Sequence, residues 1–109
     1  MKRAIGLACL IVVVAPLGVL AQDNASAVKD AFAKANQNMM SAMQSMPPMG
    51  DADKDFVMMM MPHHQGAIDM AKIELKYGKD KQLRKMAEDI IKAQEKEIAE
   101  MKKWQSAHP

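Results

Sequence analysis

Apolar residues recur along this chain at steps of three and four positions, and no stretch alternates apolar and polar residues as a strand would. Such spacing places side chains on one face of an α-helix. The first stripe predicts a helix over residues 26–46, which the proline pair at 47–48 ends, because proline cannot continue a helix. This stripe consists of Val28, Phe32, Ala35, Met39, Met43 and Met46.

A second helix is predicted from near Asp53 to Tyr77. Acidic residues at 51, 53 and 55 suit its N-terminus, where unpaired N–H groups favour negative charge. Gly78 then predicts a left-handed cap. Pro62 falls inside the helix, where it removes a backbone hydrogen bond at a cost of about 3 kcal/mol unless the surroundings compensate. We expect a kink just before His63, although helices also tolerate proline without a functional bend.

A third helix is predicted from an N-cap at Asp80 to about Trp104. The connections at 47–52 and 78–80 are short, which favours antiparallel neighbours. The predicted fold class is therefore all-α, a small antiparallel helical bundle with three main helices. A fourth helix can come from a second copy, so we expect a symmetric homodimer to be compatible with this fold. The apolar face of the third helix consists of Leu83, Met86, Ala87, Ile90, Gln94, Glu97, Ile98 and Met101.

The first 21 residues have the composition of a signal peptide. Two basic residues precede an apolar run over 5–20, and Val19-Leu20-Ala21 fits the small-residue pattern before a cleavage site. We predict cleavage after Ala21, which leaves one helical domain over residues 22–109. The alternative is an uncleaved anchor, but the run is short for a spanning helix. We expect a periplasmic or secreted protein without a stable membrane span after cleavage.

Cleavage changes what the composition implies. It removes Lys2 and Arg3 and leaves 13 basic residues against 13 acidic ones, so the mature chain is near neutral and we expect no nucleic-acid partner. The only cysteine, Cys9, is removed as well, so we expect no thiol chemistry and no disulfide. Twelve of the 13 methionines remain, which is far above ordinary usage and requires an explanation.

The methionines are densest next to two adjacent histidines. Residues 58–61 are all methionine, and Pro62, His63 and His64 follow directly. On a helix, Met60, His63 and His64 share one face, and Met70 comes to lie beside His63. Neutral imidazole is a metal ligand, and thioether sulfur is a soft one that selects Cu(I). This stretch therefore predicts a metal site, with copper, mainly Cu(I), as the metal.

Other interpretations of these residues stay open. Methionine is a flexible filler of helical cores, and this role is favoured for Met46, Met86 and, most narrowly, Met101. Met58 and Met61 fall off the inner face and suit a surface or a partner as well as a metal. The spacing also leaves open whether Met40 and Met59 bind metal.

Glu97 interrupts the apolar face of the third helix. A buried carboxylate without a partner is costly. Glu97 can accept a hydrogen bond from the outer nitrogen of a ligating histidine, as carboxylates beside metal sites often do, or it can bind the metal itself. Equally, it can reach the edge of the bundle and stay hydrated. The first helix adds Met39, Met40 and Met43 as further sulfur donors.

The segment from Met60 to Ala71, MMPHHQGAIDMA, closely resembles the domain-of-unknown-function family 305. The resemblance is strong over residues 53–104, and the segment 35–43 of the first helix looks like the family's Met-His-x-x-Met segment. It implies an exported bacterial protein with a ferritin-like helical bundle, of a kind associated in some members with copper binding and copper resistance. Residue by residue, it implies that Met60, His63, His64 and Met70 bind copper, with Met39 and Met43 as further candidates. The chain departs from the family at Met40, where histidine is frequent.

Three functions are compatible with the sequence. The first is a copper-binding protein that sequesters or carries copper and transfers it through exposed methionines to another periplasmic copper protein. The second is a ferritin-like oxidase, which we disfavour because di-iron sites need several glutamates and Glu-x-x-His pairs, and the second helix has only Glu74 and no such pair. The third is a metal-free, methionine-rich interaction module. We therefore expect a binding protein without catalytic activity.

Overall fold

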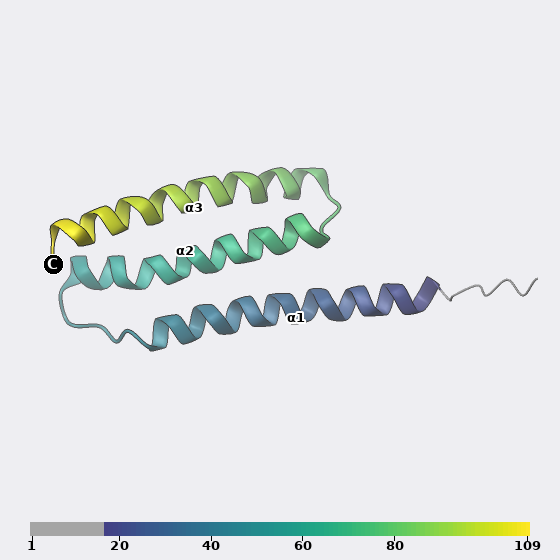
Figure 1. Ribbon diagram of the computed structural model, residues 1–109, viewed down its shortest axis with the longest axis horizontal. Coiled ribbons are helices and arrows are strands. Elements are labelled where there is room, and N and C mark those ends of the chain that lie inside the picture. The colour runs from purple at the N-terminus through teal and green to yellow at the C-terminus, as the bar shows by residue number, and fades with distance from the viewer. Residues whose placement is uncertain (1–16) are drawn as a thin grey trace, which may run out of the picture.

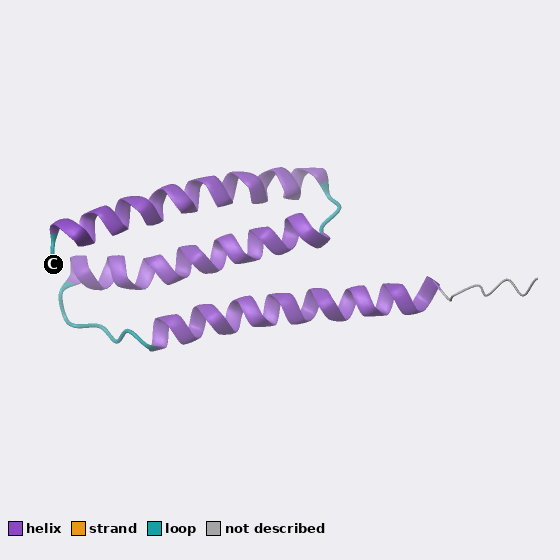
Figure 2. Cartoon of the chain, viewed as in Figure 1, coloured by secondary structure: helices purple, strands orange, loops and turns teal. Residues whose placement is uncertain are grey.

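The computed structural model describes residues 17–109, which form three helices joined by short loops (Figures 1 and 2). Helix α1 spans Leu17–Gln44, α2 spans Ala52–Tyr77 and α3 spans Lys81–Ala107. The described residues contain no strand, so the predicted all-α class is confirmed. None of the three helices has a stretch long and apolar enough to cross a bilayer.

The helix starts differ from the prediction only in α1. This helix begins at Leu17, nine residues before the predicted start at Ser26, and so continues through the predicted cleavage position after Ala21. The periodicity argument missed this extension because residues 21–27 are mostly small or polar and form no apolar stripe, although alanine favours helix intrinsically. Residues 1–16, which include most of the predicted signal peptide, lie outside the described part of the chain.

Aspartate side chains fix the starts of α2 and α3, as the sequence predicts. Asp51 is the N-cap of α2, where its side chain accepts hydrogen bonds from the backbone N–H groups of Asp53 and Lys54, each at 3.1 Å. Asp80 is the N-cap of α3 and accepts from the N–H of Leu83 at 2.9 Å. Such caps satisfy N–H groups that have no partner inside the helix.

The end of α2 corrects one prediction. Gly78 has φ −70° and ψ 151°, an extended conformation, and is not the left-handed cap that its position suggested. Gly78 leaves space instead, because a Cβ there would lie 2.6 Å from the backbone carbonyl oxygen of Glu74. The carbonyl groups of Leu75 and Gly78 both accept hydrogen bonds from Arg84 Nη1, at 2.7 and 3.1 Å. A cation from α3 therefore closes the C-terminus of α2.

Helix α2 lies between the other two helices and packs antiparallel against both (Figure 1). Helices α1 and α3 do not pack against each other, so the described bundle is one layer of three helices. Helix α2 continues through Pro62, and the kink expected there stays a prediction. At the α1 contact, a Cβ on Gly66 would lie 2.5 Å from Met39 Sδ, so the missing side chain allows this methionine to approach.

The core of this layer is small. No large side chain in it is fully buried. The buried apolar residues, of which most are alanine, are Ala35, Val57, Ile68, Ala71 and Ala87. Most of the methionines and both phenylalanines are half-buried or exposed as a result. The layer thus holds α2 in place while leaving its long side chains within reach of solvent.

Candidate metal centre

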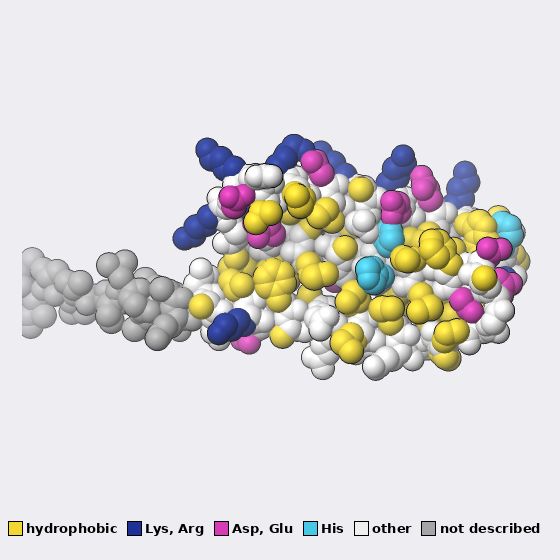
Figure 3. Space-filling model, turned by 180° about the vertical axis from the view of Figure 1, so that it is seen from behind, with side chains coloured by type: hydrophobic (Ala, Val, Ile, Leu, Met, Phe, Trp, Pro, Cys, Tyr) yellow, Lys and Arg dark blue, Asp and Glu magenta, His cyan; other side chains and the backbone are white. Residues whose placement is uncertain are grey.

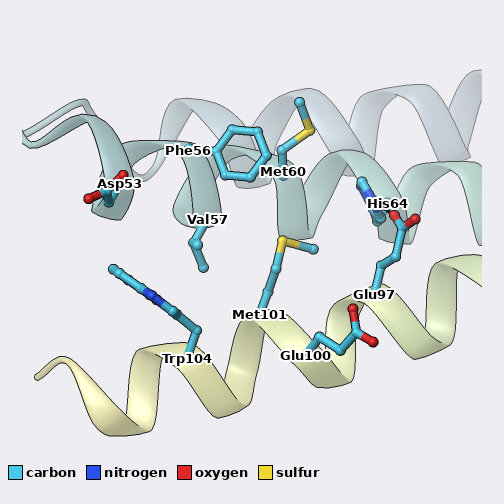
Figure 4. Close-up of a pocket in the computed structure, with 9 residues that line it drawn as sticks. All are labelled: Asp53, Phe56, Val57, Met60, His64, Glu97, Glu100, Met101 and Trp104. Atoms are coloured by element: carbon cyan, nitrogen blue, oxygen red, sulfur yellow. Dashed lines mark hydrogen bonds and ion pairs between the residues drawn. The ribbon is translucent and has the colours of Figure 1, made fainter.

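A cleft between α2 and α3 brings together two pairs of residues, each one helical turn apart (Figure 4). Met60 and His64 come from α2, and Glu97 and Met101 come from α3. Side chains four positions apart lie on the same face of a helix. Because the two helices run antiparallel, His64 faces Glu97, and Met60 is level with Met101. The cleft therefore results from the antiparallel register of α2 and α3, and the short loop at 78–80 sets that register.

The imidazole of His64 is held at one nitrogen and free at the other. Its Nε2 contacts Oε2 of Glu97, as Figure 4 shows. The Nδ1 atom is buried and has no hydrogen-bond partner among the described residues. The side chain of His64 is 15% exposed and that of Glu97 is 52% exposed, so the carboxylate reaches the ring from the solvent side.

This arrangement determines what His64 can do chemically. A carboxylate accepts hydrogen bonds, so beside an ionised Glu97 the ring donates from Nε2–H. The neutral tautomer with that proton has its lone pair on Nδ1. Leaving a buried polar atom without a partner costs about 1–3 kcal/mol, which a ligand at Nδ1 would recover. Metal-binding histidines commonly donate their other N–H to a carboxylate in this way.

Two thioethers lie in the same cleft. In the close-up, Met101 reaches from α3 toward α2 beside the carboxylate of Glu97, whereas the side chain of Met60 starts on α2 and turns away from α3 (Figure 4). A single imidazole and two thioethers form a soft set of donors. Among residues 17–109, no three histidine, cysteine, aspartate or glutamate side chains are grouped so that they could hold a metal ion. The cleft therefore combines nitrogen with sulfur.

The remaining predicted ligands lie outside this cleft. His63 is exposed, because adjacent residues point about 100° apart on a helix. Met70 lies seven residues later, close to the same side as His63, and is also exposed. Met39 and Met43 are half-buried on α1, and Met39 packs against Gly66. The structure thus separates the predicted donors into the His64 cleft and a second set toward α1.

Sequence reasoning missed the walls of the cleft. They consist of Asp53, Phe56, Val57, Glu100 and Trp104. The available signal was the antiparallel register, since pairing residue 64 with residue 97 also places residue 57 level with residue 104. Stacking between Trp104 and His108, whose ring centroids are 4.3 Å apart, covers the outer end of this wall. The aromatic and aliphatic side chains of the wall therefore add apolar surface beside the two thioethers.

These observations define the class of the protein. It is an antiparallel, all-helical protein whose central helix carries a group of histidine and methionine side chains. A family model described as a domain of unknown function, DUF305, matches residues 17–105. The chain belongs to this family, which confirms the resemblance noted in the sequence. No curated protein matches the chain. The family description assigns no function, so the function must be argued from the residues themselves.

Proposed function

We propose that this is an exported copper-binding protein that sequesters or carries copper, mainly as Cu(I), and so contributes to copper homeostasis or resistance. One observation carries the proposal. The Nδ1 atom of His64 is buried without a partner in a cleft that also contains the thioethers of Met60 and Met101. Such a nitrogen, held in position from its other side by Glu97, is suited to a metal ion that also accepts sulfur.

Softness of the donors selects the metal in this proposal. Thioether sulfur favours Cu(I) over harder ions such as Mg²⁺ or Mn²⁺, which prefer oxygen. Neither thioether nor imidazole requires the loss of a proton from a thiol, so binding does not depend on cysteine in an oxidising compartment. Glu97 serves in this arrangement to fix the tautomer and orientation of His64, while the metal is held at Nδ1 and by sulfur.

The second set of donors suits entry and transfer of copper. In this set, His63 is exposed and the thioether of Met70 is 39% exposed. The nearby Met59, whose role the sequence left open, is 40% exposed and can join them. Exposed soft donors can exchange a metal ion with a partner protein without opening the bundle. We therefore assign capture and transfer to another periplasmic copper protein to this set, and retention to the His64 cleft. The proposal includes no catalytic reaction.

Anaerobic Cu(I) binding tests the proposal. The purified protein competes with a chromophoric Cu(I) chelator, and the variants His64→Ala and His63→Ala are compared with it. We expect His64→Ala to weaken binding about 100-fold, since the buried nitrogen is lost, and His63→Ala to weaken it about 10-fold or less. Folding of each variant is checked by circular dichroism. Absence of Cu(I) binding by folded wild-type protein would overturn the proposal.

A metal-free interaction module is the second candidate, and one observation favours it. Large apolar side chains on all three helices are exposed, among them Phe56 at 59% and Met86 at 50%. Under this alternative, replacing both histidines changes stability but no binding property. Cu(I) titration of the double variant His63→Ala/His64→Ala separates the two functions, because only the copper proposal predicts loss of binding.

A further inference from the structure

A second cleft, which we call the end cleft, lies where the C-terminal end of α3 meets the start of α2 (Figure 1). Its walls come from three segments that are distant in the sequence. The loop between α1 and α2 contributes Met49, α2 contributes Met58, and the residues after α3 contribute His108. None of these three side chains lines the His64 cleft. Figure 3 shows histidine and hydrophobic side chains together at this end of the layer, apart from the other histidines.

Two contacts hold the imidazole of His108. Its Nδ1 lies 2.8 Å from the backbone carbonyl oxygen of Trp104, one helical turn earlier. A carbonyl oxygen can only accept a hydrogen bond, so the ring donates from Nδ1–H, and the neutral imidazole carries its lone pair on Nε2. The ring also stacks on the indole of Trp104, with ring centroids 4.3 Å apart and planes inclined by 13°. The tautomer and the plane of His108 are therefore fixed, and the lone pair on Nε2 is available to a metal ion.

The two thioethers of the end cleft are also held in position. The carboxylate of Asp55 accepts hydrogen bonds from the backbone N–H groups of Met49 and Gly50, at 2.8 and 2.9 Å. These bonds fasten the loop to the start of α2. Met58 follows Asp55 by three positions and so lies on the same side of the helix. A half-buried thioether on α2 and an exposed one on the fastened loop thus line the same cleft.

The side chains around the end cleft favour a soft ion over a hard one. No aspartate or glutamate lines it, so a hard divalent ion would find no side-chain carboxylate there. Lys54 is the lysine that lines it, and its Nζ donates to the backbone oxygen of Pro109 at 3.2 Å. This positive charge opposes a divalent ion about twice as strongly as a monovalent one. Imidazole and thioether are donors that Cu(I) accepts.

We propose that Nε2 of His108 and the thioethers of Met49 and Met58 form a second copper site, selective for Cu(I). His108 lies beyond residues 17–105, which the family model matches, so the family pattern does not include this ligand. The inference shares its metal with the proposed function, but the two clefts share no donor atom. Either site can therefore fail without the other.

NMR of the imidazole nitrogens tests the site directly. The chain has three histidines, so the rings of His63, His64 and His108 can be assigned with single His→Gln variants. Nitrogen-labelled, metal-free protein is expressed as the full chain without a C-terminal tag. It is titrated anaerobically with Cu(I), buffered by a chromophoric chelator, at slightly alkaline pH, where histidine side chains are ordinarily neutral. Cu(I) is diamagnetic, so the ring signals remain visible, and long-range proton–nitrogen spectra report protonation and metal binding at each nitrogen.

Before metal is added, we expect His108 to carry its proton on Nδ1. On addition of Cu(I), its Nε2 signal should shift while Nδ1 keeps the proton. We expect the double variant Met49→Leu/Met58→Leu to weaken Cu(I) binding at His108 about 10-fold or more, because two soft donors are lost. The matched control is Met40→Leu/Met86→Leu, which removes two exposed thioethers outside both clefts and should leave this binding unchanged. Circular dichroism checks that both double variants remain helical.

Three results would overturn the second site. The first is a His108 ring that does not respond to Cu(I), whether or not His64 responds. The second is binding at His108 that Met49→Leu/Met58→Leu leaves unchanged, because the ring would then act as an isolated surface ligand. The third is equal weakening by the control. The same titration separates this site from the proposed function, since a response at His64 alone supports only the His64 cleft and a response at His108 alone supports only the end cleft.

Discussion

Glu97 of α3 meets the Nε2 atom of His64 of α2 across 33 positions of sequence, and this contact orients an imidazole that lies in one cleft with the thioethers of Met60 and Met101. The carboxylate is half-exposed while the ring is mostly buried. The pair therefore joins the solvent-facing side of α3 to the interior of the helix pair. A ligand at Nδ1 of His64 would therefore bind an imidazole whose orientation is held by Glu97 of α3.

Removing the charge of Glu97 should weaken copper binding without unfolding the protein. We expect Glu97→Gln to lower the Cu(I) affinity about 10-fold, because a neutral amide holds the Nε2–H less strongly and makes the ring a poorer ligand. Competition with a Cu(I) chelator measures this. The matched control is Glu100→Gln, which changes a carboxylate that lines the same cleft. If both variants bind equally, Glu97 has no special role.

Replacing the sulfur of Met101 with carbon should show whether this side chain binds copper or only packs in the core. Met101→Leu keeps the volume of the side chain, so we expect a change of less than about 1.5 kcal/mol in the free energy of unfolding. The Cu(I) affinity should fall about 10-fold or more, because a soft donor is lost. Met86→Leu, outside the cleft, should leave the affinity unchanged. Copper titration and urea denaturation of both variants give the answer, and a purely structural role predicts no difference in affinity.

Adding a methyl group at Gly66 should test the contact between α1 and α2. Alanine gains about 1 kcal/mol of helix propensity over glycine, but its Cβ would lie 2.5 Å from Met39 Sδ, and overpacking costs about 1–3 kcal/mol. We expect Gly66→Ala to lower the free energy of unfolding by about 1 kcal/mol. In the background of Met39→Ala, the same change should be stabilising. A urea-denaturation double-mutant cycle that finds no coupling would contradict the close approach of Met39 to Gly66.

Losing the Arg84 side chain should destabilise the end of α2 and leave the His64 cleft intact. Arg84→Met removes two hydrogen bonds to carbonyl groups and keeps the aliphatic stem, so we expect a loss of about 1.5–3 kcal/mol. Lys85→Met breaks an exposed ion pair with Asp89 and should cost less than about 1 kcal/mol. Thermal and urea denaturation compare the two. Equal losses would show that Arg84 does not close the helix.

Export should shorten the chain. We expect the protein recovered from the periplasm of a bacterial host to begin at Gln22, because Val19-Leu20-Ala21 precedes the predicted cut. Mass spectrometry of the intact protein measures this directly. Replacing Ala21 with a bulky residue should block processing at this position. A mass that retains Met1 in periplasmic protein would contradict the prediction.

Sequence periodicity was sufficient for the helices, because amphipathic stripes and the caps at Asp51 and Asp80 are local signals. It was not sufficient for the conformation of Gly78, where a side chain from another helix, Arg84, closes α2 instead of a left-handed turn. Residues near the end of a helix do not indicate which cationic side chain of another helix will donate hydrogen bonds to its last carbonyl groups. The start of α1 was missed for a related reason, since propensity without an apolar stripe leaves no periodic signal.

The donor set shows the same division. A helical wheel places His63 and His64 near each other, but it does not say where neighbouring helices lie around α2. Because α1 and α3 take opposite sides, His64 is covered and His63 is exposed. The sequence allowed three roles for Glu97, and the structure shows a contact with His64 together with a half-exposed carboxylate at the edge of the bundle. Whether this histidine or Glu97 itself binds a metal stays a prediction.

Each helix packs only against its neighbour in the chain, and this arrangement also affects the order in which the helices unfold. Since α1 packs on α2 alone, it can detach without disturbing the pairing of α2 with α3. Such neighbour-only contacts favour rapid folding and allow partial opening below the cost of full unfolding. Amide hydrogens of α1 should exchange with solvent earliest, and copper bound at His64 should slow exchange in α2 and α3 while leaving α1 nearly as fast as before.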